Sequence, residues 1–332
     1  MFVFAIIFIA LIGLELAYIQ LADRFNIIDK PNERSSHTRP TIRGGGVLFA
    51  IAWVIYFVMY GWHFAYFTLG MLCLAGISFW DDVKPLSNRV RILVHILAFS
   101  LCFYEIGIFD VLPWWGILIA YIVAIGCLNA VNFMDGINGI TGLYALSIFA
   151  PILWVYTGQW ERNPLSILIA SIVVFGWFNF RKRARCFAGD VGSVSIAYLI
   201  IFFVMGLMLN MWQIDEGNLV IKTGVYHGFE PKYILLLTLY GVDVILTLIH
   251  RLYLKENIFQ AHRKHLFQYL ANEMKWPHLA VACLYAGIQS MISVWVMTSN
   301  VTLLEGISCI LTFSIIYVAA KRFIYVQKIK AA

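Results

Sequence analysis

The stretch Gly189-Asp-Val-Gly-Ser-Val-Ser-Ile-Ala-Tyr-Leu-Ile-Ile-Phe-Phe-Val-Met-Gly-Leu-Met-Leu-Asn-Met-Trp-Gln213 joins a short polar motif to a long apolar run. Residues 193–213 carry no charged side chain, and a helix needs roughly 20 apolar residues to cross the hydrocarbon core of a bilayer. We therefore predict a transmembrane helix here, with Ser193 as its N-cap and Asp190 just ahead of its first turn. Such a segment indicates an all-α membrane fold with a polar motif at a membrane surface.

The rest of the chain has the same apolar character. Of its 332 residues, 61% are hydrophobic and 13% are charged, whereas charged residues make up roughly a quarter of a soluble domain. The net charge of +6 is typical of basic residues that flank membrane spans, which argues against a nucleic-acid partner. The six cysteines include no CxxC pair, so we expect neither a disulfide framework nor a zinc site.

Apolar runs between polar breaks predict about 11 transmembrane helices in a single domain that covers residues 1–332. The run that opens at Met1 has neither a basic region before it nor a small-residue cleavage site, so we expect a retained span and not a signal peptide. The predicted spans cover residues 1–21, 46–61, 63–80, 91–108, 113–131, 140–157, 164–180, 193–213, 232–249, 277–297 and 301–320.

Lysine and arginine residues indicate the orientation of these spans. Of the 24, 21 fall in alternate polar segments on one side, and only Arg162, Lys222 and Lys232 fall on the other. Because cytoplasmic loops are enriched in Lys and Arg, we predict an N-terminus outside and a C-terminus in the cytoplasm.

This topology places every polar motif on the cytoplasmic side. A charge at the bilayer centre costs about 2.5–3.5 kcal/mol on insertion scales, so these groups belong at helix ends, where they form one polar site at the inner interface. The motifs are Asp29–Gly46, Asp81-Asp82, Asn129–Asn138, Gly189–Ser193 and His262–His265.

The adjacent carboxylates of Asp81 and Asp82 repel each other unless a cation or a shared proton lies between them. A divalent metal would remove this repulsion, and so would a basic neighbour such as Lys84, Arg89 or Arg91. The alternative is a solvated acidic pair at the end of a helix.

Asn129, Asn132 and Asp135 are spaced three residues apart at the end of an apolar run, so they are predicted to lie near one helix face, and Asn138 continues the series. Amide groups and one carboxylate can hold a hydrated Mg²⁺ and form hydrogen bonds with a base or a diphosphate. We expect these residues to bind substrate.

Two further motifs are candidates for phosphate binding. A helix N-terminus attracts phosphate and an aspartate there can ligate the metal that carries it, so Asp190 is a candidate, although the motif also fits a simple helix cap. His262 and His265 would share a helix face, and we prefer phosphate binding to a zinc pair or a solvated loop. Asp243, within a predicted span, is either functional or held by a buried hydrogen bond.

The order of these motifs resembles the polyprenyl-phosphate N-acetylhexosamine-1-phosphate transferases of glycosyltransferase family 4, from about Asp29 to Gln268. The resemblance implies an enzyme of the bacterial cytoplasmic (inner) membrane, active on the cytoplasmic face, that uses Mg²⁺ or Mn²⁺. Such an enzyme transfers an N-acetylhexosamine 1-phosphate from a UDP-sugar to undecaprenyl phosphate and releases UMP. The sequence His262-Arg-Lys-His265 lacks the three adjacent histidines of the peptidoglycan branch, which favours O-antigen, capsule or a similar surface glycan.

The resemblance also implies roles for individual residues. Asp190 is similar to the metal-ligating aspartate, and Asn132 to the asparagine that assists at the metal and the diphosphate. Asp81 and Asp82 match the acidic pair proposed to deprotonate or position the lipid phosphate. These four residues are the predicted catalytic group, with Asp190 and Asn132 as its metal ligands.

The remaining matches concern substrate binding. Arg91 lies where relatives place a phosphate-binding cation, and His262, Arg263 and His265 match the basic loop that binds the sugar phosphate. Asn138 replaces the aspartate of many bacterial relatives, so we interpret it as a uracil contact at which aspartate is tolerated. The rival interpretation of the whole chain is a membrane transporter or flippase, but transporters usually keep their polar groups near the membrane midplane.

The predicted topology can be tested with single cysteines placed near Arg34 and near Lys264. An impermeant thiol reagent should label both only after the cells are permeabilised, because both lie on the predicted cytoplasmic side. Labelling of either cysteine in intact cells would overturn the orientation.

Overall fold

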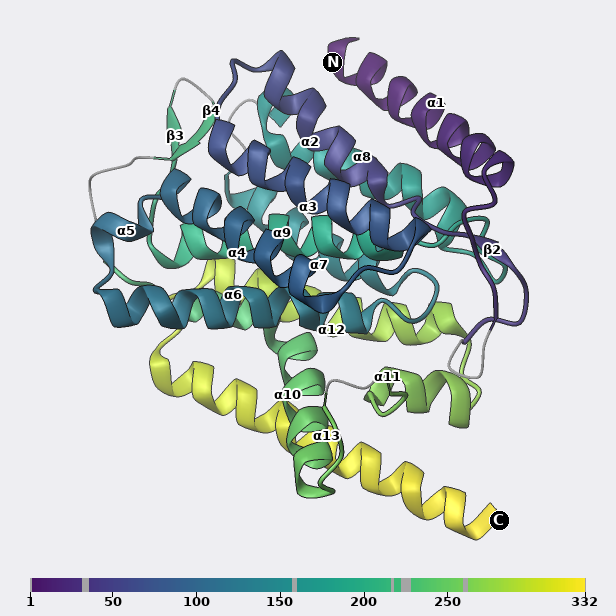
Figure 1. The fold of residues 1–332 in the computed structure, drawn as a ribbon. Helices are drawn as coiled ribbons and strands as arrows, with labels where there is room; N and C mark the ends of the chain where they lie inside the picture. Colours follow the sequence, from purple (N-terminus) through teal and green to yellow (C-terminus); the bar gives the residue numbers. More distant parts are fainter. Residues whose placement is uncertain are drawn as a thin grey trace.

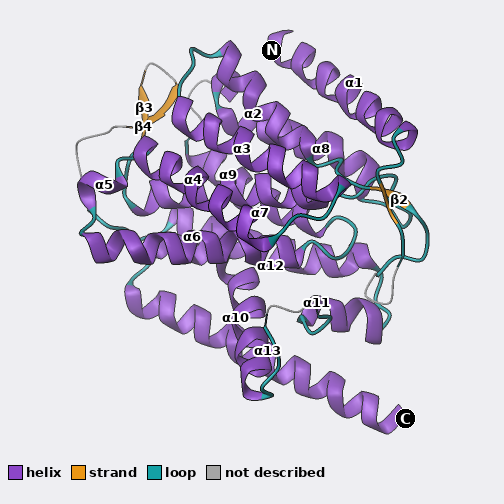
Figure 2. Ribbon diagram, in the orientation of Figure 1, coloured by secondary structure: helices purple, strands orange, loops and turns teal. Residues whose placement is uncertain are grey.

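The computed structural model describes residues 2–31, 36–156, 160–215, 218–221, 228–258 and 262–331, and these form a bundle of α-helices (Figures 1 and 2). The helices and strands, in chain order, are α1 (Phe2–Arg24), β1 (Ile28–Asp29), β2 (Thr41–Ile42), α2 (Val47–Met59), α3 (Ala65–Val83), α4 (Asn88–Glu105), α5 (Ile108–Val111), α6 (Trp114–Met134), α7 (Ile140–Val155), the 3₁₀ helix η1 (Trp160–Arg162), α8 (Pro164–Asn179), α9 (Gly189–Met208), β3 (Trp212–Asp215), β4 (Asn218–Ile221), the 3₁₀ helix η2 (Pro231–Leu237), α10 (Thr238–Tyr253), α11 (Leu266–Gln268), the π-helical turn η3 (Tyr269–Glu273), α12 (His278–Thr298) and α13 (Leu303–Ala331).

A helix occupies each of the apolar runs that predicted a span, so the chain is an all-α membrane protein. Within the described residues, six segments are long and apolar enough to cross a bilayer, namely α1, α6, α9, the continuous η2–α10 segment, α12 and α13. The helices α2, α7 and α8 are equally apolar in character but shorter. The count of 11 crossings and the orientation stay predictions.

The helix α9 forms the buried axis of the bundle. Of its most apolar stretch, 89% is buried inside the protein, compared with 17% in α1 and 6% in α13. Figure 1 accordingly shows α1 and α13 at the periphery and α9 among the other helices. The apolar side chains of α1 and α13 are therefore available to lipid, whereas those of α9 pack against protein.

Aromatic side chains hold α3 and α4 against α9. The ring of Phe67 stacks on Tyr198 at a centroid distance of 4.5 Å and on Phe202 at 3.8 Å. The hydroxyl of Tyr198 donates to the Ala98 carbonyl oxygen at 2.8 Å, which satisfies the polar end of an otherwise buried ring. These contacts fix the position of α3, whose C-terminal end carries Asp81 and Asp82.

Backbone hydrogen bonds tie the loop after α1 to the segment before α9. The strands β1 and β2 pair antiparallel, and Ile42 forms an isolated parallel bridge with Cys186. The N–H of Phe187 donates to the Ile42 carbonyl oxygen at 2.8 Å, and the N–H of Gly45 donates back to Phe187 at 2.9 Å. Residues far apart in the sequence thus form one wall beside the start of α9.

Two glycines permit this contact. A Cβ atom on Gly46 would lie 2.9 Å from the Ala188 carbonyl oxygen and closer still to the Cα of Gly192. A Cβ on Gly192 would in turn lie 2.6 Å from the Cα of Gly46. Because backbone atoms cannot move aside as a flexible side chain can, only glycine fits at both positions.

The substitution Gly46→Ala should therefore lower the thermal unfolding midpoint of the detergent-purified protein by several degrees, whereas Gly76→Ala should leave it unchanged or slightly raised. A Cβ at Gly76, inside α3, has no heavy atom within 4 Å, and alanine is preferred to glycine in a helix by about 0.5–1 kcal/mol. Equal midpoints for the two variants would contradict the close approach of Gly46 to α9.

Candidate active site

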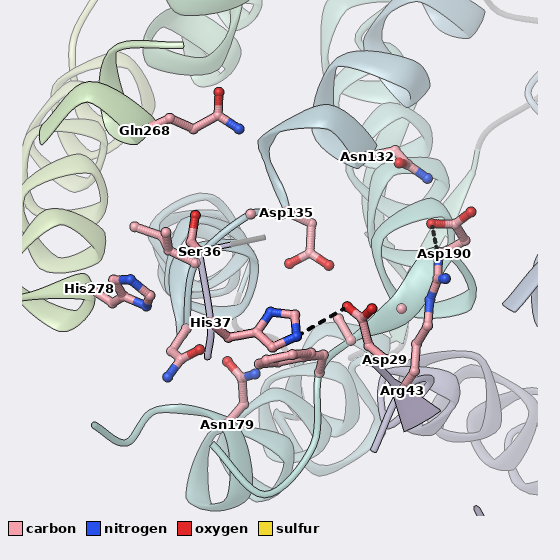
Figure 3. A pocket seen from close by; sticks show the side chains of 16 residues that line it. Asp29, Ser36, His37, Arg43, Asn132, Asp135, Asn179, Asp190, Gln268 and His278 are labelled. Carbon is pink, nitrogen blue, oxygen red and sulfur yellow. Dashed lines mark hydrogen bonds and ion pairs between the residues drawn. The ribbon is translucent and has the colours of Figure 1, made fainter. Parts of the chain in front are cut away.

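A cavity of about 330 Å³ lies beside the start of α9 (Figure 3). Four residues predicted from the sequence to belong to the site meet there, namely Asn132, Asp135, Asn138 and Asp190. The described residues that line it are Asp29, Ser36, His37, Arg43, Asn132, Asp135, Gly136, Ile137, Asn138, Asn179, Phe187, Ala188, Gly189, Asp190, Gln268 and His278.

The first turn of α9 carries Asp190 and is capped from another helix. The predicted N-cap role of Ser193 is wrong, because α9 begins at Gly189 and the Ser193 hydroxyl donates to the Gly189 carbonyl oxygen at 3.0 Å from inside the helix. The carboxylate of Asp82 provides the cap instead. It accepts the N–H of Asp190 at 2.8 Å and the N–H of Val191 at 3.0 Å.

Gly189 is required by this cap. Its φ is +72°, in the left-handed region that favours glycine. A Cβ at Gly189 would lie 2.6 Å from Oδ2 of Asp82 and 2.7 Å from the backbone nitrogen of Gly44. The glycine therefore makes room for the capping carboxylate and for the loop that carries Arg43.

Arg43 bridges two aspartates from different helices. Its Nε lies 2.6 Å from Oδ1 of Asp82 and its Nη2 lies 3.0 Å from Oδ1 of Asp190. The Asp82 side chain is fully buried, so the guanidinium and two backbone N–H groups compensate a charge that water cannot reach. Arg43 also lines the cavity, where it is the cation nearest to Asp190.

Asp81 has a different arginine partner from Asp82. Its Oδ2 accepts from Nη1 of Arg91 at 2.8 Å, and its Oδ1 accepts the N–H of Leu86 at 2.6 Å. The same Arg91 nitrogen lies 3.9 Å from Oδ2 of Asp190. Basic partners therefore compensate the acidic pair: Arg91, one of the predicted neighbours, pairs with Asp81, and Arg43 of a distant segment pairs with Asp82. Neither Asp81 nor Asp82 is among the described residues that line the cavity.

The series that begins at Asn129 does not stay on one helix face. The helix α6 ends at Met134, so Asp135 is its C-cap and turns away from the line of the two asparagines. The amide of Asn129 donates to the Ile125 carbonyl oxygen at 2.9 Å within α6 and does not reach the cavity, whereas Asn132 lines it.

The turn after α6 is held by hydrogen bonds to neighbouring segments. Oδ1 of Asp135 accepts from the Thr141 hydroxyl at 2.6 Å, and burial, with a smaller contribution from the negative charge of Asp190, raises the pKa of Asp135 to about 6. The amide of Asn138 donates to the Arg181 carbonyl oxygen at 2.8 Å. The turn is thereby fixed against the end of α8.

The basic loop lies beside the cavity and does not line it directly. His265 is buried, with its Nδ1 3.1 Å from Oδ1 of Asp243, and the ring of His262 lies 4.8 Å from that of His265. Burial, followed by the nearby positive groups, lowers the pKa of His262 to about 4, so this ring is neutral at pH 7. Neither His262, Arg263 nor His265 is among the described lining residues, but Gln268 of the same segment is.

Comparison with known proteins connects this arrangement to one family. The model of glycosyl transferase family 4 matches residues 64–208. Over this region the chain is similar to glycosyl transferase family 4. The matched family region runs from α3 to the end of α9, so it contains Asp81 and Asp82, the turn after α6 and Asp190.

Several curated relatives align with the chain. It is 25% identical to an undecaprenyl-phosphate alpha-N-acetylglucosaminyl 1-phosphate transferase of Thermotoga maritima, over 88% of this chain and 90% of the relative. It is 29% identical to a phospho-N-acetylmuramoyl-pentapeptide-transferase of Dictyoglomus thermophilum, over 57% of this chain and 74% of the relative. It is 26% identical to a probable undecaprenyl-phosphate N-acetylglucosaminyl 1-phosphate transferase of Bacillus subtilis, over 57% of this chain and 58% of the relative.

Some lining residues are not predicted from the sequence. The sequence marks 29–46 as a polar motif without indicating roles for its members, and Arg43 is only one of the basic residues that indicate orientation. In Figure 3 His37 and Asp29 face each other across 4.0 Å, and Gln268 and His278 lie on the side away from Asp190. Their shared signal is the density of polar side chains at the ends of the apolar runs.

The cavity offers oxygen ligands suited to a hard divalent cation. The described residues contain no cluster of three or more His, Cys, Asp or Glu side chains that could hold a metal alone. Asp135, Asp190 and Asn132 nevertheless line one cavity, and Mg²⁺ is commonly held by one or two carboxylates together with substrate phosphates. The donor set therefore fits Mg²⁺ or Mn²⁺ bound jointly with a phosphorylated substrate.

Two matched asparagine substitutions test the geometry of the turn. Asn138→Asp should lower the thermal unfolding midpoint, because a carboxylate would face the Arg181 carbonyl oxygen at the place of an N–H donor, at a cost of about 1–3 kcal/mol. This reverses the tolerance expected from the sequence. Asn132→Asp, in the same cavity but without a hydrogen bond to an identified partner, should change the midpoint little. An unchanged Asn138→Asp midpoint would contradict the contact.

Proposed function

We propose that this protein transfers an N-acetylhexosamine 1-phosphate from a UDP-sugar to undecaprenyl phosphate and releases UMP, at the cytoplasmic face of a bacterial inner membrane. The carrying observation is the cavity that gathers Asp190, Asp135 and Asn132 beside Arg43. Similarity to glycosyl transferase family 4 supports the same reaction class, since relatives at 24–29% identity carry the names of such transferases.

The reaction exchanges one phosphoric anhydride for another. An oxygen atom of the lipid phosphate attacks the β-phosphorus of the UDP-sugar, the bond from that phosphorus to the bridging oxygen breaks, and the electron pair leaves with UMP. Such a transfer needs positioning and neutralisation of negative charge more than it needs a covalent intermediate.

The residues of the cavity can meet these needs. Arg43 presents a guanidinium that can bind a phosphate oxygen, and its two aspartate partners hold it in a fixed orientation. Asp190 and Asn132 would hold the Mg²⁺ or Mn²⁺, with Asp135 contributing a further oxygen. When bound, the cation would neutralise the diphosphate charge and stabilise the leaving group. The amides of Asn138 and Asn179 lie at the same cavity and can contact the uridine.

The acidic pair has a supporting role in this proposal. Asp82 holds the first turn of α9 and Arg43, while Asp81 holds Arg91 within 3.9 Å of Asp190. A lipid phosphate that approaches between Arg43 and Arg91 would meet two cations whose counter-charges are already fixed. In this arrangement Asp81 and Asp82 position the phosphate-binding arginines.

The location at the inner interface suits both substrates, because a UDP-sugar is cytosolic and a polyprenyl chain is soluble in lipid. The sequence His262-Arg-Lys-His265 supports an N-acetylhexosamine donor for a surface glycan such as O-antigen or capsule. The relatives include both N-acetylglucosamine and N-acetylmuramoyl-pentapeptide transferases, so UDP-N-acetylmuramoyl-pentapeptide is the competing donor.

Purified protein should release UMP from a UDP-N-acetylhexosamine only when undecaprenyl phosphate and Mg²⁺ or Mn²⁺ are both present. Asp190→Asn should lower turnover by roughly a thousandfold, since loss of a metal ligand costs several kcal/mol in the transition state at 1.36 kcal/mol per decade. This substitution keeps the backbone N–H of residue 190, so the hydrogen bond from that N–H to the Asp82 carboxylate is retained. The measurement is metal-dependent UMP release in detergent.

Asp110→Asn is the matched control, because Asp110 is an exposed aspartate in α5, away from the residues that line the cavity. It should keep the wild-type rate. If the wild type releases no UMP with any UDP-N-acetylhexosamine, the proposed donor is wrong. Release from UDP-N-acetylmuramoyl-pentapeptide would then identify the competing donor, and release from neither would make a transporter the better explanation. If Asp190→Asn keeps most of the rate, the metal assignment fails.

A further inference from the structure

The carboxylate of Asp243 in α10 is buried and receives hydrogen bonds from several elements. Nδ1 of His265 lies 3.1 Å from its Oδ1, and the hydroxyl of Tyr285 in α12 donates to its Oδ2 at 2.7 Å. The backbone N–H of Leu266 lies 3.1 Å from both carboxylate oxygens, and that of Phe267 lies 3.5 Å from Oδ2. A buried carboxylate that collects this many donors fixes the segment that supplies them.

Apart from the Tyr285 hydroxyl, these donors belong to one short segment, His265–Gln268, which comprises the N-cap and all of α11. The first N–H groups of a helical turn have no partner inside the helix, and Asp243 accepts two of them from another helix. The side chain of Gln268 completes the turn, because its Oε1 accepts the N–H of His265 at 3.2 Å. The conformation of His265–Gln268 therefore depends on the position of Asp243.

The far end of this segment reaches the cavity. Phe267 packs against the turn after α6, where a Cβ on Gly136 would lie 3.0 Å from its ring carbons. Gln268 lines the cavity, and its amide points into it in Figure 3. Since Oε1 of Gln268 is used by His265, the amide N–H₂ group is the part that can donate to a ligand.

The C-terminal helix α13 contacts α10 next to Asp243 through hydrogen bonds. The hydroxyl groups of Thr247 and Tyr317 lie 2.6 Å apart, and that of Tyr317 donates to the Asp243 carbonyl oxygen at 3.5 Å. Nζ of Lys321 in α13 lies 3.3 Å from the Thr247 hydroxyl oxygen. The anchor for the segment is thus built from α10, α12 and α13, outside the region that the family model matches.

We propose that Gln268 binds a phosphate oxygen of the nucleotide diphosphate and that Asp243 is the positioning residue that holds Gln268 in place. This inference rests on the proposed function, because the ligand is the donor's UDP moiety. If Asp243 only stabilised the packing of α10, it would not need to contact the segment that carries Gln268. Asp243 instead touches the backbone of residues directly before Gln268.

Binding of UDP to purified full-length protein with Mg²⁺ tests the inference through a double-mutant cycle of Asp243→Asn and Gln268→Ala. Each single variant should weaken the Kd for UDP by about tenfold, the size expected from loss of one hydrogen bond to a charged group. The double variant should be no weaker than the weaker single variant, because Asp243 acts through Gln268. If the double variant instead weakened the Kd for UDP by about a hundredfold, the product of the two single effects, the two residues would act separately and the proposal would be overturned.

Hydrogen exchange gives a readout that does not depend on activity. In ligand-free Asp243→Asn protein, a peptide that contains Leu266 and Phe267 should exchange faster than in the wild type, because both N–H groups lose their acceptor. Tyr285→Phe removes one hydrogen bond but keeps the carboxylate, so it should raise exchange less. It provides a milder variant should Asp243→Asn not fold. Unchanged exchange in both would overturn the positioning role.

Glu105→Gln is the matched control for the carboxyl-to-amide change. Glu105 in α4 also accepts a backbone N–H from another helix, that of Phe67 at 3.0 Å, but it contacts no residue of the segment His265–Gln268. It should leave the UDP affinity and the exchange of that peptide unchanged. Failure of wild-type protein to bind UDP would instead overturn the proposed donor and this inference together, whereas normal UDP binding with independent single effects would overturn the inference alone.

Discussion

The carboxylate of Asp82 connects three segments that the sequence keeps far apart. Asp82 lies in the last turn of α3. Its carboxylate accepts the first N–H groups of α9 and pairs with Arg43 of the loop after α1. A fully buried carboxylate without such partners would carry a desolvation penalty of several kcal/mol, so the three segments must be present together for any of them to be stable. The cavity exists because this junction fixes Arg43 and Asp190 on one side of it.

Much of the fold could be predicted from the sequence, because membrane helices are long, apolar and separated by polar breaks. A helix occupies every predicted apolar run, and the run that starts at Ser193 became the buried axis of the bundle. Local detail was less accessible. The segment that precedes α10 is a 3₁₀ helix, and α13 extends to Ala331, well past the predicted boundary. Hydropathy measures the apolar character of a run but not the hydrogen-bond pattern of its ends.

The candidate site was predictable in the same limited way. Asn132, Asp135, Asn138 and Asp190 meet at one cavity, and each stood in a motif that a single segment displays. The residues that pair with them could not be predicted from a single segment. Arg43 and Asp190 are 147 positions apart, and nothing in either segment specifies the other. The error at Ser193 has the same origin, because a local rule for helix caps cannot foresee that a carboxylate from a different helix takes the position.

The acids near the cavity differ in what they can still bind. Asp82 uses its oxygens on Arg43 and two backbone N–H groups, and Asp81 uses its own on Arg91 and Leu86. Oδ1 of Asp190 pairs with Arg43 and its Oδ2 lies 3.9 Å from Arg91, while Oδ1 of Asp135 accepts from Thr141, and both carboxylates line the cavity. A carboxylate that lines the cavity can reach a cation there, whereas Asp81 and Asp82, which are not among the described lining residues, are held by protein donors elsewhere. Two adjacent carboxylates in the sequence therefore do not indicate which carboxylates face the cavity, because the fold turns Asp81 and Asp82 towards arginines and brings Asp135 and Asp190 to the cavity.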